Sequence, residues 1–363
     1  GSVFGIEREV RMQLGLVGLP QSGKTTLFQL LTEARGNGAY GARIEKAVVR
    51  VPDRRVDFLA RLYQPRKTTY AQLEVIDIPG LVPGSEKEAS VFLQSVRDTD
   101  ALVHVVRAFA DDNVPHLEGS IDPLRDLELI EYELLLADLD LVEKRIDRIK
   151  QGKKRNEAEL NWLQRVKKML EEETPISNIT FSSEEQAWLR TYQFLTAKPI
   201  LVALNLDEAS FQDGIYPHKQ EILDYVGRRG IPLVLISAKL ESEIAELEGE
   251  ERELFMRDMG ISEPGIVRLA QAAYRLLGLI SFFTVGEDEV KAWTIVQGTP
   301  ARKAAGKIHS DIERGFIRAE VVKYEDLEAC GTMARVREKG LFRLEGKDYL
   351  VQDGDIIHFR FNV

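Results

Sequence analysis

The stretch Gly18-Leu19-Pro20-Gln21-Ser22-Gly23-Lys24-Thr25 matches the pattern G-x-x-x-x-G-K-[ST] of a phosphate-binding loop without a mismatch. A buried strand is expected just before it, over 13–17, and apolar residues at helical spacing follow it, over 26–31. In such a loop the backbone N–H groups converge on the phosphates, the lysine reaches the β- and γ-oxygens, and the last hydroxyl ligates Mg²⁺. We expect nucleotide contacts from Gly18, Gln21, Ser22, Gly23, Lys24, Thr25 and Thr26. The sequence therefore predicts a site for a nucleoside triphosphate with Mg²⁺.

The composition is that of an ordinary globular protein, with 44% apolar and 30% charged residues, and 363 residues suggest two or three domains. The absence of an 18-residue apolar run predicts no membrane span, and the single Cys330 excludes an intramolecular disulfide framework and indicates a reducing compartment. We expect a cytoplasmic protein in which residues 1–11 are an extension or tag remnant. A net charge of −10 argues against strong non-specific binding to bare nucleic acid.

Apolar runs that read as strands alternate with helical patterns along the first two thirds of the chain. This alternation predicts an α/β fold with a mostly parallel sheet. The expected strands are 13–17, 73–76, 101–106, 200–204 and 231–236. Several end in polar signatures, at the edge where ligands bind in open α/β sheets.

The second of these strands ends in Asp77-Ile78-Pro79-Gly80, the D-x-x-G pattern. Asp77 is expected to hold Mg²⁺, usually through a water, and the Gly80 N–H to meet the γ-phosphate. The alternative is an ordinary Asp-x-Pro-Gly turn. Leu81 stands where Ras-like GTPases have a water-orienting Gln, so water must be positioned by another group or hydrolysis must be slow.

Two further signatures follow the strands 200–204 and 231–236: Asn205-Leu206-Asp207-Glu208 and Ser237-Ala238-Lys239. Guanine-specific proteins read Asn-Lys-x-Asp at the first position. Glu208 is one methylene longer than that Asp and should mis-aim the guanine pair, whereas the Asn205 amide can pair with adenine N6 and N7. These residues favour ATP over GTP, although the same motif could be a helix cap or turn.

The chain resembles the YchF family of Obg-like ATPases over nearly its whole length. The resemblance rests on GLPQSGKTTLF, IDIPGLVPG, DALVHVVRAF, GSIDPLRDLELIEYELLLADL, NLDE, ISAKLESEIAEL and EGKDYLVQDGDIIHFRFNV. It implies a P-loop nucleotide-binding domain interrupted by an α-helical hairpin and followed by a C-terminal α+β TGS domain of β-grasp type. It also implies ATP hydrolysis, association with ribosomes, phosphate binding by 21–26, metal binding by Thr25, and base contacts from Asn205, Leu206 and Glu208.

The helical hairpin is also expected from the residues themselves. Leu135, Leu139, Val142, Ile146 and Ile149 recur at spacings of three and four, and Leu160, Leu163, Val166 and Leu170 repeat the pattern. Between the two helices lies a basic turn with Lys150, Lys153, Lys154 and Arg155. This tip is either solvated or in contact with ribosomal RNA or tRNA phosphates.

The expected domain boundaries follow from these patterns. The nucleotide-binding domain should comprise 12–123 and 195–278, the hairpin 124–194 and the TGS domain 279–363. The basic run Arg302 to Lys307 in the last domain offers a further surface for RNA or protein, or a plain docking module. That the TGS domain contacts nucleic acid is an analogy with the family.

Three positions depart from the family pattern. In the first switch Arg43 precedes Ile44-Glu45, with no Thr nearby to join the Mg²⁺ shell. Gln21 replaces the usual Asn, which leaves the dependence on potassium open. The second switch, Ser85-Glu86-Lys87-Glu88, is short.

His116 is a candidate for handling the attacking water, because the family has a histidine at the matching loop position and imidazole titrates near neutral pH. The alternative is an ordinary loop histidine.

The sequence thus predicts a Mg²⁺-dependent, slowly hydrolysing ATPase, monomeric, with Lys24, Gly80 and His116 as catalytic residues. Two alternatives stay open: a GTPase of the same fold, and a protein whose ribosome or RNA binding is gated by ATP with little hydrolysis. The ribosomal state bound, the physiological process and the turnover rate are not predicted.

Overall fold

β1 (Gln13–Val17), the strand that leads into the phosphate-binding loop, lies inside a six-stranded sheet with the order β2-β4-β1-β5-β6-β7. β4, β1, β5, β6 and β7 run parallel to one another. The other strands are β2 (Glu45–Arg50), β4 (Gln72–Asp77), β5 (Ala101–Arg107), β6 (Ile200–Asn205) and β7 (Leu233–Ile236). Each of the five expected strands overlaps one of these, so the predicted mostly parallel sheet is confirmed.

A computed structural model of the chain describes residues 12–32, 45–82, 84–116 and 118–362. The chain divides into two compact units, the first made of residues up to 47 and 74–269, the second of 48–73 and 270–363. The backbone therefore passes from one unit to the other three times. No helix of the described residues is both long and apolar enough to cross a membrane.

The sheet of the first unit is covered by helices, and all seven residues of β5 are buried, as expected for a central parallel strand. Phe92 and Val96 of α3 and Ile130 of α4 pack against strand residues such as Val17 and Leu102. The helices of this unit that lie outside the hairpin are α1 (Lys24–Thr32), α3 (Glu86–Arg97), α7 (Glu208–Asp213), α8 (Lys219–Arg229), α9 (Ala238–Glu246) and α10 (Gly249–Asp258), and α11 (Gly265–Leu276) continues from it into the second unit.

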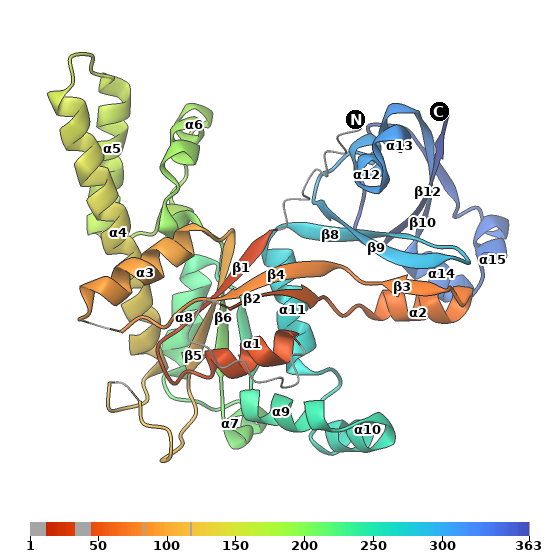
Figure 1. Cartoon of the computed structure of the whole chain (residues 1–363), viewed down its shortest axis with the longest axis horizontal. Helices are drawn as coiled ribbons and strands as arrows, with labels where there is room; N and C mark the ends of the chain where they lie inside the picture. Colours follow the sequence, from red (N-terminus) through yellow and green to blue (C-terminus); the bar gives the residue numbers. More distant parts are fainter. Residues whose placement is uncertain (1–11, 33–44, 83, 117, 363) are drawn as a thin grey trace, which may run out of the picture. The chain divides into compact units, whose positions relative to one another are not determined.

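The predicted helical hairpin is present in the first unit. α4 (Pro123–Gln151) and α5 (Glu157–Glu171) lie side by side, as Figure 1 shows, and join through a turn at 152–156. The apolar residues predicted to face one another are buried between the helices, apart from the partly buried Leu139. Trp162 of α5 extends this core through aromatic contacts with Phe181 and Trp188, the latter on α6 (Ser183–Tyr192). Two short 3₁₀ helices, η1 (Ile176–Asn178) and η2 (Leu195–Ala197), flank α6.

His104 lies in the middle of β5, in register with Val17 on one side and Val202 on the other. Its side chain is buried, and this burial lowers the pKa of the imidazole to about 3. A buried cation would lose its hydration, so the histidine is neutral in the folded protein at neutral pH.

The second unit is built on another six-stranded sheet, ordered β11-β10-β12-β8-β9-β3. β8 pairs with β9 and β10 with both β11 and β12 in antiparallel fashion, whereas β12 is parallel to β8 and β3 to β9. Its elements are α2 (Arg54–Tyr63), β3 (Lys67–Thr69), β8 (Leu279–Thr284), β9 (Glu289–Val296), α12 (Ala301–Ile308), α13 (Ser310–Arg314), β10 (Phe316–Lys323), α14 (Tyr324–Cys330), α15 (Met333–Glu338), β11 (Arg343–Glu345) and β12 (Asp355–Phe361). A C-terminal module of mixed sheet and short helices is therefore confirmed, and its assignment as a TGS domain stays a prediction.

The division of the chain differs from the boundaries expected from the sequence. The sequence patterns place residues 48–73 in the nucleotide-binding domain, but in the structure they group with 270–363. The physical reason is main-chain pairing, because Lys67, Thr68 and Thr69 of β3 extend the second sheet beside β9. The hairpin does not separate from the first unit, and the C-terminal boundary falls at 269/270 instead of 278/279.

Candidate functional site

The phosphate-binding loop has a backbone that only glycine allows at one key position. Gly23 has a φ of +91°, and a Cβ added there would lie 2.2 Å from the Asn205 amide nitrogen. A Cβ on Gly18 would lie 2.7 Å from the Val105 carbonyl oxygen. The glycines thus let the loop pass close to its neighbours, and Gln21 adopts a positive φ of 68° at the exposed top of the turn.

The structure brings Lys24 and Thr25, the first two residues of α1, next to Asp77 at the end of β4. The buried Lys24 Nζ forms an ion pair with Asp77 and also donates to the Ile78 carbonyl oxygen. The Thr25 hydroxyl lies 3.4 Å from Asp77 Oδ2. The two sequence motifs, 52 or more residues apart, therefore meet at the carboxyl edge of the sheet, which is where open α/β sheets bind ligands.

The oxygens of Thr25 and Asp77 fit a Mg²⁺ ion. Octahedral Mg²⁺ holds its ligands at about 2.0–2.1 Å, so neighbouring ligand oxygens are about 3 Å apart, close to the 3.4 Å seen here. The part of the chain that the structure describes holds no cluster of three or more His, Cys, Asp or Glu side chains arranged for a metal. The pair thus suits an ion that completes its shell with phosphate and water. The buried Ser22 hydroxyl, which lacks a hydrogen-bond partner among the described residues, adds an uncommitted polar group to the loop.

Gly80 and Leu81 follow Asp77 and have different surroundings. Gly80 passes close to the phosphate-binding loop, since a Cβ added to it would lie 3.3 Å from Pro20 and 3.4 Å from the Gly18 carbonyl oxygen. Leu81 is 1% exposed and packs in the apolar cluster with Val17 and Ile78. A buried aliphatic side chain cannot orient an attacking water, so another group must do so if hydrolysis occurs.

Asn205 connects two loops of the site. Its amide nitrogen donates to the Ser22 carbonyl oxygen (3.0 Å), and its amide oxygen accepts from the Ala238 N–H (2.9 Å). Asn205 is buried, and both ends of its amide are bonded to protein. The Asn205 amide is therefore not free to make the pairing with adenine that the sequence led us to expect. It instead links the phosphate-binding loop to the Ser237-Ala238-Lys239 loop.

The other residues expected to contact the nucleotide base differ in burial and in their place in the fold. The Leu206 side chain is in an apolar core with Val106 and Leu127, which leaves only its backbone for a ligand. Ser237 is the buried N-cap of α9, and Lys239 is exposed. Glu208 begins α7 and is half-buried.

Glu243 on α9 is a neighbour of Glu208 that the sequence patterns do not reveal. Burial, followed by the hydrogen bond and negative charge of Glu208, raises the pKa of the Glu243 carboxyl. Two adjacent carboxyls resist ionising together. No local spacing links positions 208 and 243, because the fold alone brings α7 and α9 together.

His116 lies in the loop between β5 and α4, and both of its ring nitrogens have partners. Nε2 is 2.7 Å from Asp126 Oδ2, and Nδ1 accepts from the Glu118 N–H at 2.9 Å, so the Nε2 hydrogen points to Asp126. The side chains of His116 and Asp126 are 3% and 4% exposed. Action on a water would require His116 to leave Asp126, and its catalytic role stays a prediction. Arg43 and Ile44 of the first switch lie outside the described residues, and Glu45 begins β2.

Comparison with known proteins identifies relatives over the full length. A family model described as "50S ribosome-binding GTPase" matches residues 13–138, and the YchF-GTPase_C model, described as "Protein of unknown function (DUF933)", matches 279–362. The chain is 46% identical to the Ribosome-binding ATPase YchF of Bacillus subtilis, covering 96% of this chain and 99% of the relative. It is 39% identical to Obg-like ATPase 1 of Caenorhabditis elegans, covering 97% and 92%.

A solved structure agrees with these sequence matches. The YchF GTPase of Schizosaccharomyces pombe is 33% identical and superposes with a TM-score of 0.83, covering 96% of this chain and 98% of that one. The G-x-x-x-x-G-K-[ST] loop, the Asp77 motif and the loops that begin at Asn205 and Ser237 are thus set in a fold shared along the whole chain. The chain belongs to the YchF family.

Proposed function

We propose that this protein is a Mg²⁺-dependent ATPase that binds ATP in the phosphate-binding loop and hydrolyses it slowly. The observation that carries the proposal is the cluster of Lys24, Thr25 and Asp77 at the carboxyl edge of the parallel sheet. Its support comes from relatives named as ATPases that match this chain over nearly their whole length.

Each residue has a role that follows from its position. Lys24, at the N-terminus of α1, would exchange Asp77 for the β- and γ-phosphates, and the loop amides would bind the phosphate oxygens. Thr25 and Asp77 would hold Mg²⁺, Asp77 directly or through water, and the bound ion would neutralise the charge that develops on the γ-phosphoryl group. The Gly80 N–H would meet the γ-phosphate and sense its loss.

Slow turnover follows from the groups near the expected water. Leu81 is buried in the apolar core, and His116 is held by Asp126 and Glu118. Hydrolysis therefore depends on a rearrangement that brings His116 or another group to the γ-phosphate. Such a requirement suits a protein that stays in its ATP-bound state for a long time before hydrolysis changes that state.

We further propose ATP as the preferred nucleotide. The basis is Glu208, whose longer side chain replaces the Asp that pairs with guanine. With the Asn205 amide bonded to Ser22 and Ala238, recognition of adenine would fall on Glu208, Lys239 and the backbone of Leu206. Potassium dependence stays open, because Gln21 occupies the position of the usual Asn.

The partner we propose is the ribosome, in the cytoplasm, with the protein acting as a monomer. Relatives carry the name ribosome-binding ATPase, and the outer half of the hairpin offers a surface for RNA phosphates. Residues 144–168 contain ten Lys and Arg against three Asp and Glu, whereas the whole chain has 49 against 59. Lys150, Lys153, Lys154 and Arg155 are all exposed at its tip. Contact of the second unit with RNA or tRNA, through the exposed Arg302, Lys303 and Lys307, is the alternative.

The test is titration of the purified protein with fluorescent ATP and GTP analogues in Mg²⁺ buffer, followed by phosphate release with and without ribosomes, in potassium and in sodium. We expect tight ATP binding, weaker GTP binding and release stimulated by ribosomes. Lys24→Ala should weaken ATP binding by roughly 10- to 150-fold, the loss of about 1.5–3 kcal/mol typical of hydrogen bonds to a charged group. Lys219→Ala, which alters an exposed lysine of the same unit, serves as the matched control. Undiminished affinity of the Lys24 variant would contradict the site.

A second candidate is an ATP-gated binding protein without turnover. Two observations favour this candidate. Leu81 is buried, and both ring nitrogens of His116 are hydrogen-bonded to protein, so neither residue is placed to activate water. Its signature would be ATP-dependent ribosome binding with no phosphate release under any of these conditions.

A further inference from the structure

Residues 48–73, here called the strap, leave the first sheet through β2 and return to it through β4. The strap belongs by its contacts to the second unit, although the sequence on both sides of it belongs to the first. Its return strand ends at Asp77, the partner of Lys24 at the phosphate site. Its outgoing strand follows the stretch where the sequence predicts the first switch.

The strap begins and ends as an extension of the first sheet. β2 neighbours β4 in that sheet, and the Val51 N–H donates to the Ala71 carbonyl oxygen (2.8 Å), which continues the pairing beyond both strands. The strand that ends at Asp77 is therefore connected to the strap through a paired ladder as well as through its own chain.

The far part of the strap is joined to the second sheet by main-chain bonds. β3 pairs in parallel with β9 from Lys67 to Thr69, and the Arg66 N–H donates to the Glu287 carbonyl oxygen (3.0 Å). The Thr69 hydroxyl adds a 2.6 Å hydrogen bond to Glu289. Leu59 and Val56 of α2 are fully buried, so the strap also has a packed apolar face.

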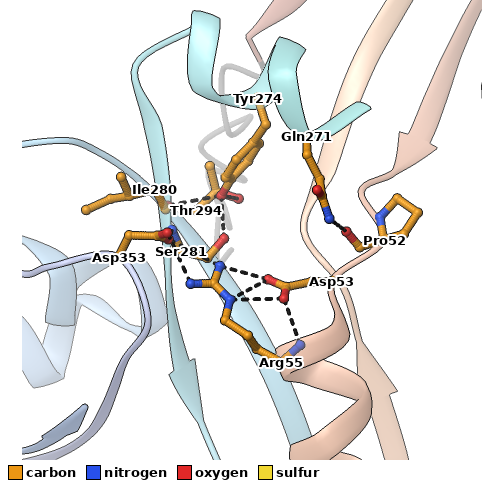
Figure 2. A network of polar contacts seen from close by, with 9 residues as sticks. All are labelled: Pro52, Asp53, Arg55, Gln271, Tyr274, Ile280, Ser281, Thr294 and Asp353. Carbon is orange, nitrogen blue, oxygen red and sulfur yellow. Dashed lines mark hydrogen bonds and ion pairs between the residues drawn. The ribbon is translucent and has the colours of Figure 1, made fainter. Parts of the chain in front are cut away.

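A polar network centred on Arg55 fastens the start of α2 to the same sheet (Figure 2). The Arg55 guanidinium donates three hydrogen bonds to Asp53, at 2.9, 3.0 and 3.3 Å, and two to Asp353, at 3.1 and 3.3 Å. Asp353 in turn accepts from the Ser281 N–H on β8 (2.9 Å). Burial by itself lowers the pKa of Arg55, but Asp53 and Asp353 outweigh it and the pKa is raised, so the guanidinium stays charged.

Residues of α11 complete the network. The Gln271 side chain donates to the Pro52 carbonyl oxygen (3.0 Å), and the Tyr274 hydroxyl lies 2.7 Å from the Ser281 hydroxyl. Strap, α11 and β8 are thus joined by a bidentate Arg–carboxylate contact, which adds geometric specificity, and by the buried contact of Tyr274 with Ser281.

We propose that the strap transmits the nucleotide state of the phosphate site to the second unit, with the contacts of Arg55 to Asp53 and Asp353 as the latch that makes it move with that unit. The inference rests on the proposed binding of ATP. It adds that the second unit responds to the γ-phosphate through residues 48–73 and needs no direct contact with the nucleotide.

The experiment is hydrogen–deuterium exchange of the full-length protein saturated with ADP or with a non-hydrolysable ATP analogue, with saturation checked by fluorescence titration. We expect exchange rates in β3, β8 and β9 to differ between the two states by about fivefold or more, the lower range of measured allosteric couplings. This comparison uses the unaltered protein, so it does not depend on the folding of any variant.

Arg55→Gln then tests the latch. We expect unchanged affinity for the ATP analogue and loss of the nucleotide-dependent difference in β8 and β9. Arg66→Gln is the matched control, because Arg66 lies in the same strap but its ion pair with Asp288 (3.7 Å) is almost fully exposed. The control should keep the difference, since exposed pairs contribute little.

The outcomes separate the two proposals. If the protein binds nucleotide but residues 48–73 and 270–363 exchange identically in the ADP and ATP-analogue states, the proposed role of the strap is wrong and the proposed function stands. A difference that persists in Arg55→Gln would overturn the latch, and loss of the difference in the Arg66→Gln control would overturn the assignment of the latch to Arg55. Failure of the unaltered protein to bind either nucleotide would overturn the proposed function and the strap with it.

Discussion

At the scale of the residue, the site depends on a few side chains whose partners are far away in sequence. Asn205 illustrates this dependence, because its amide joins Ser22 to Ala238 across 183 and 33 positions. Its type and place after a strand were readable from the sequence, and its use as a brace was not. The same holds for the contact between Lys24 and Asp77, whose residues were predicted but whose direct pairing was not.

Glu208 is the residue on which nucleotide choice should depend. Glu208→Asp shortens the side chain to the length found in guanine-specific proteins, and we expect GTP to gain on ATP by roughly 5- to 150-fold, the equivalent of about 1–3 kcal/mol for a bidentate base contact. The measurement is the ratio of dissociation constants for the two nucleotides. Glu243→Gln removes the adjacent charge without changing the reach of Glu208, and should leave the ratio close to that of the unaltered protein. An unchanged ratio in Glu208→Asp would place base recognition elsewhere.

His104 should make stability depend on pH. Burial holds the pKa of His104 in the folded chain near 3, below the ordinary value of 6.5, so the unfolded chain binds the proton first. Stability is therefore complete above about pH 6.5 and falls as the pH drops towards 3, by up to about 1.4 kcal/mol per pH unit. In urea titrations between pH 7 and 5, His104→Leu should lose this part of the slope. His358→Gln changes an exposed histidine and should keep the pH dependence of the unaltered protein. Equal slopes of stability against pH in the unaltered protein and both variants would contradict the assignment to His104.

At the scale of the element, the outer half of the hairpin, residues 144–168, concentrates positive charge in an acidic chain. Replacing Lys150, Lys153, Lys154 and Arg155 by Gln should weaken ribosome binding and reduce the slope of log affinity against log salt, by up to about 0.7–0.9 for each phosphate that the tip no longer neutralises. The matching variant in α12 replaces Arg302, Lys303 and Lys307 by Gln. A reduced slope only in this second variant would move the interface to the second unit, and an unchanged slope in the hairpin variant would remove the hairpin from the interface.

The elements that the sequence predicted best are those whose signal is local. The strands of the first sheet are continuous apolar runs, and the hairpin helices repeat apolar residues at three and four positions, so both could be read from short windows. β3 carries no such signal, because Lys67, Thr68 and Thr69 are polar and their partners in β9 are more than 200 positions away. Long-range pairing of a three-residue strand is invisible to periodicity.

At the scale of the whole molecule, the grouping of segments by their contacts differs from the domain boundaries expected from the sequence. The phosphate site could be predicted because its loop, strand end and base loops each have a recognisable motif. The grouping of 48–73 with 270–363 could not be predicted, because it depends on contacts between residues far apart in the sequence, such as Arg55 and Asp353. Motifs indicated where the candidate site lies, and tertiary contacts decided which segment groups with which unit.

The discontinuity of the second unit also has a consequence for biosynthesis. Residues 48–73 are translated early, yet the rest of the unit they complete begins only at about residue 270, roughly 200 codons later. At about 5–20 residues per second, β3 and α2 would wait roughly 10–40 s with their apolar face unpaired. During that interval the emerging polypeptide carries a segment that chaperones can recognise, and a pause or truncation in the last quarter of the message would leave that segment permanently exposed.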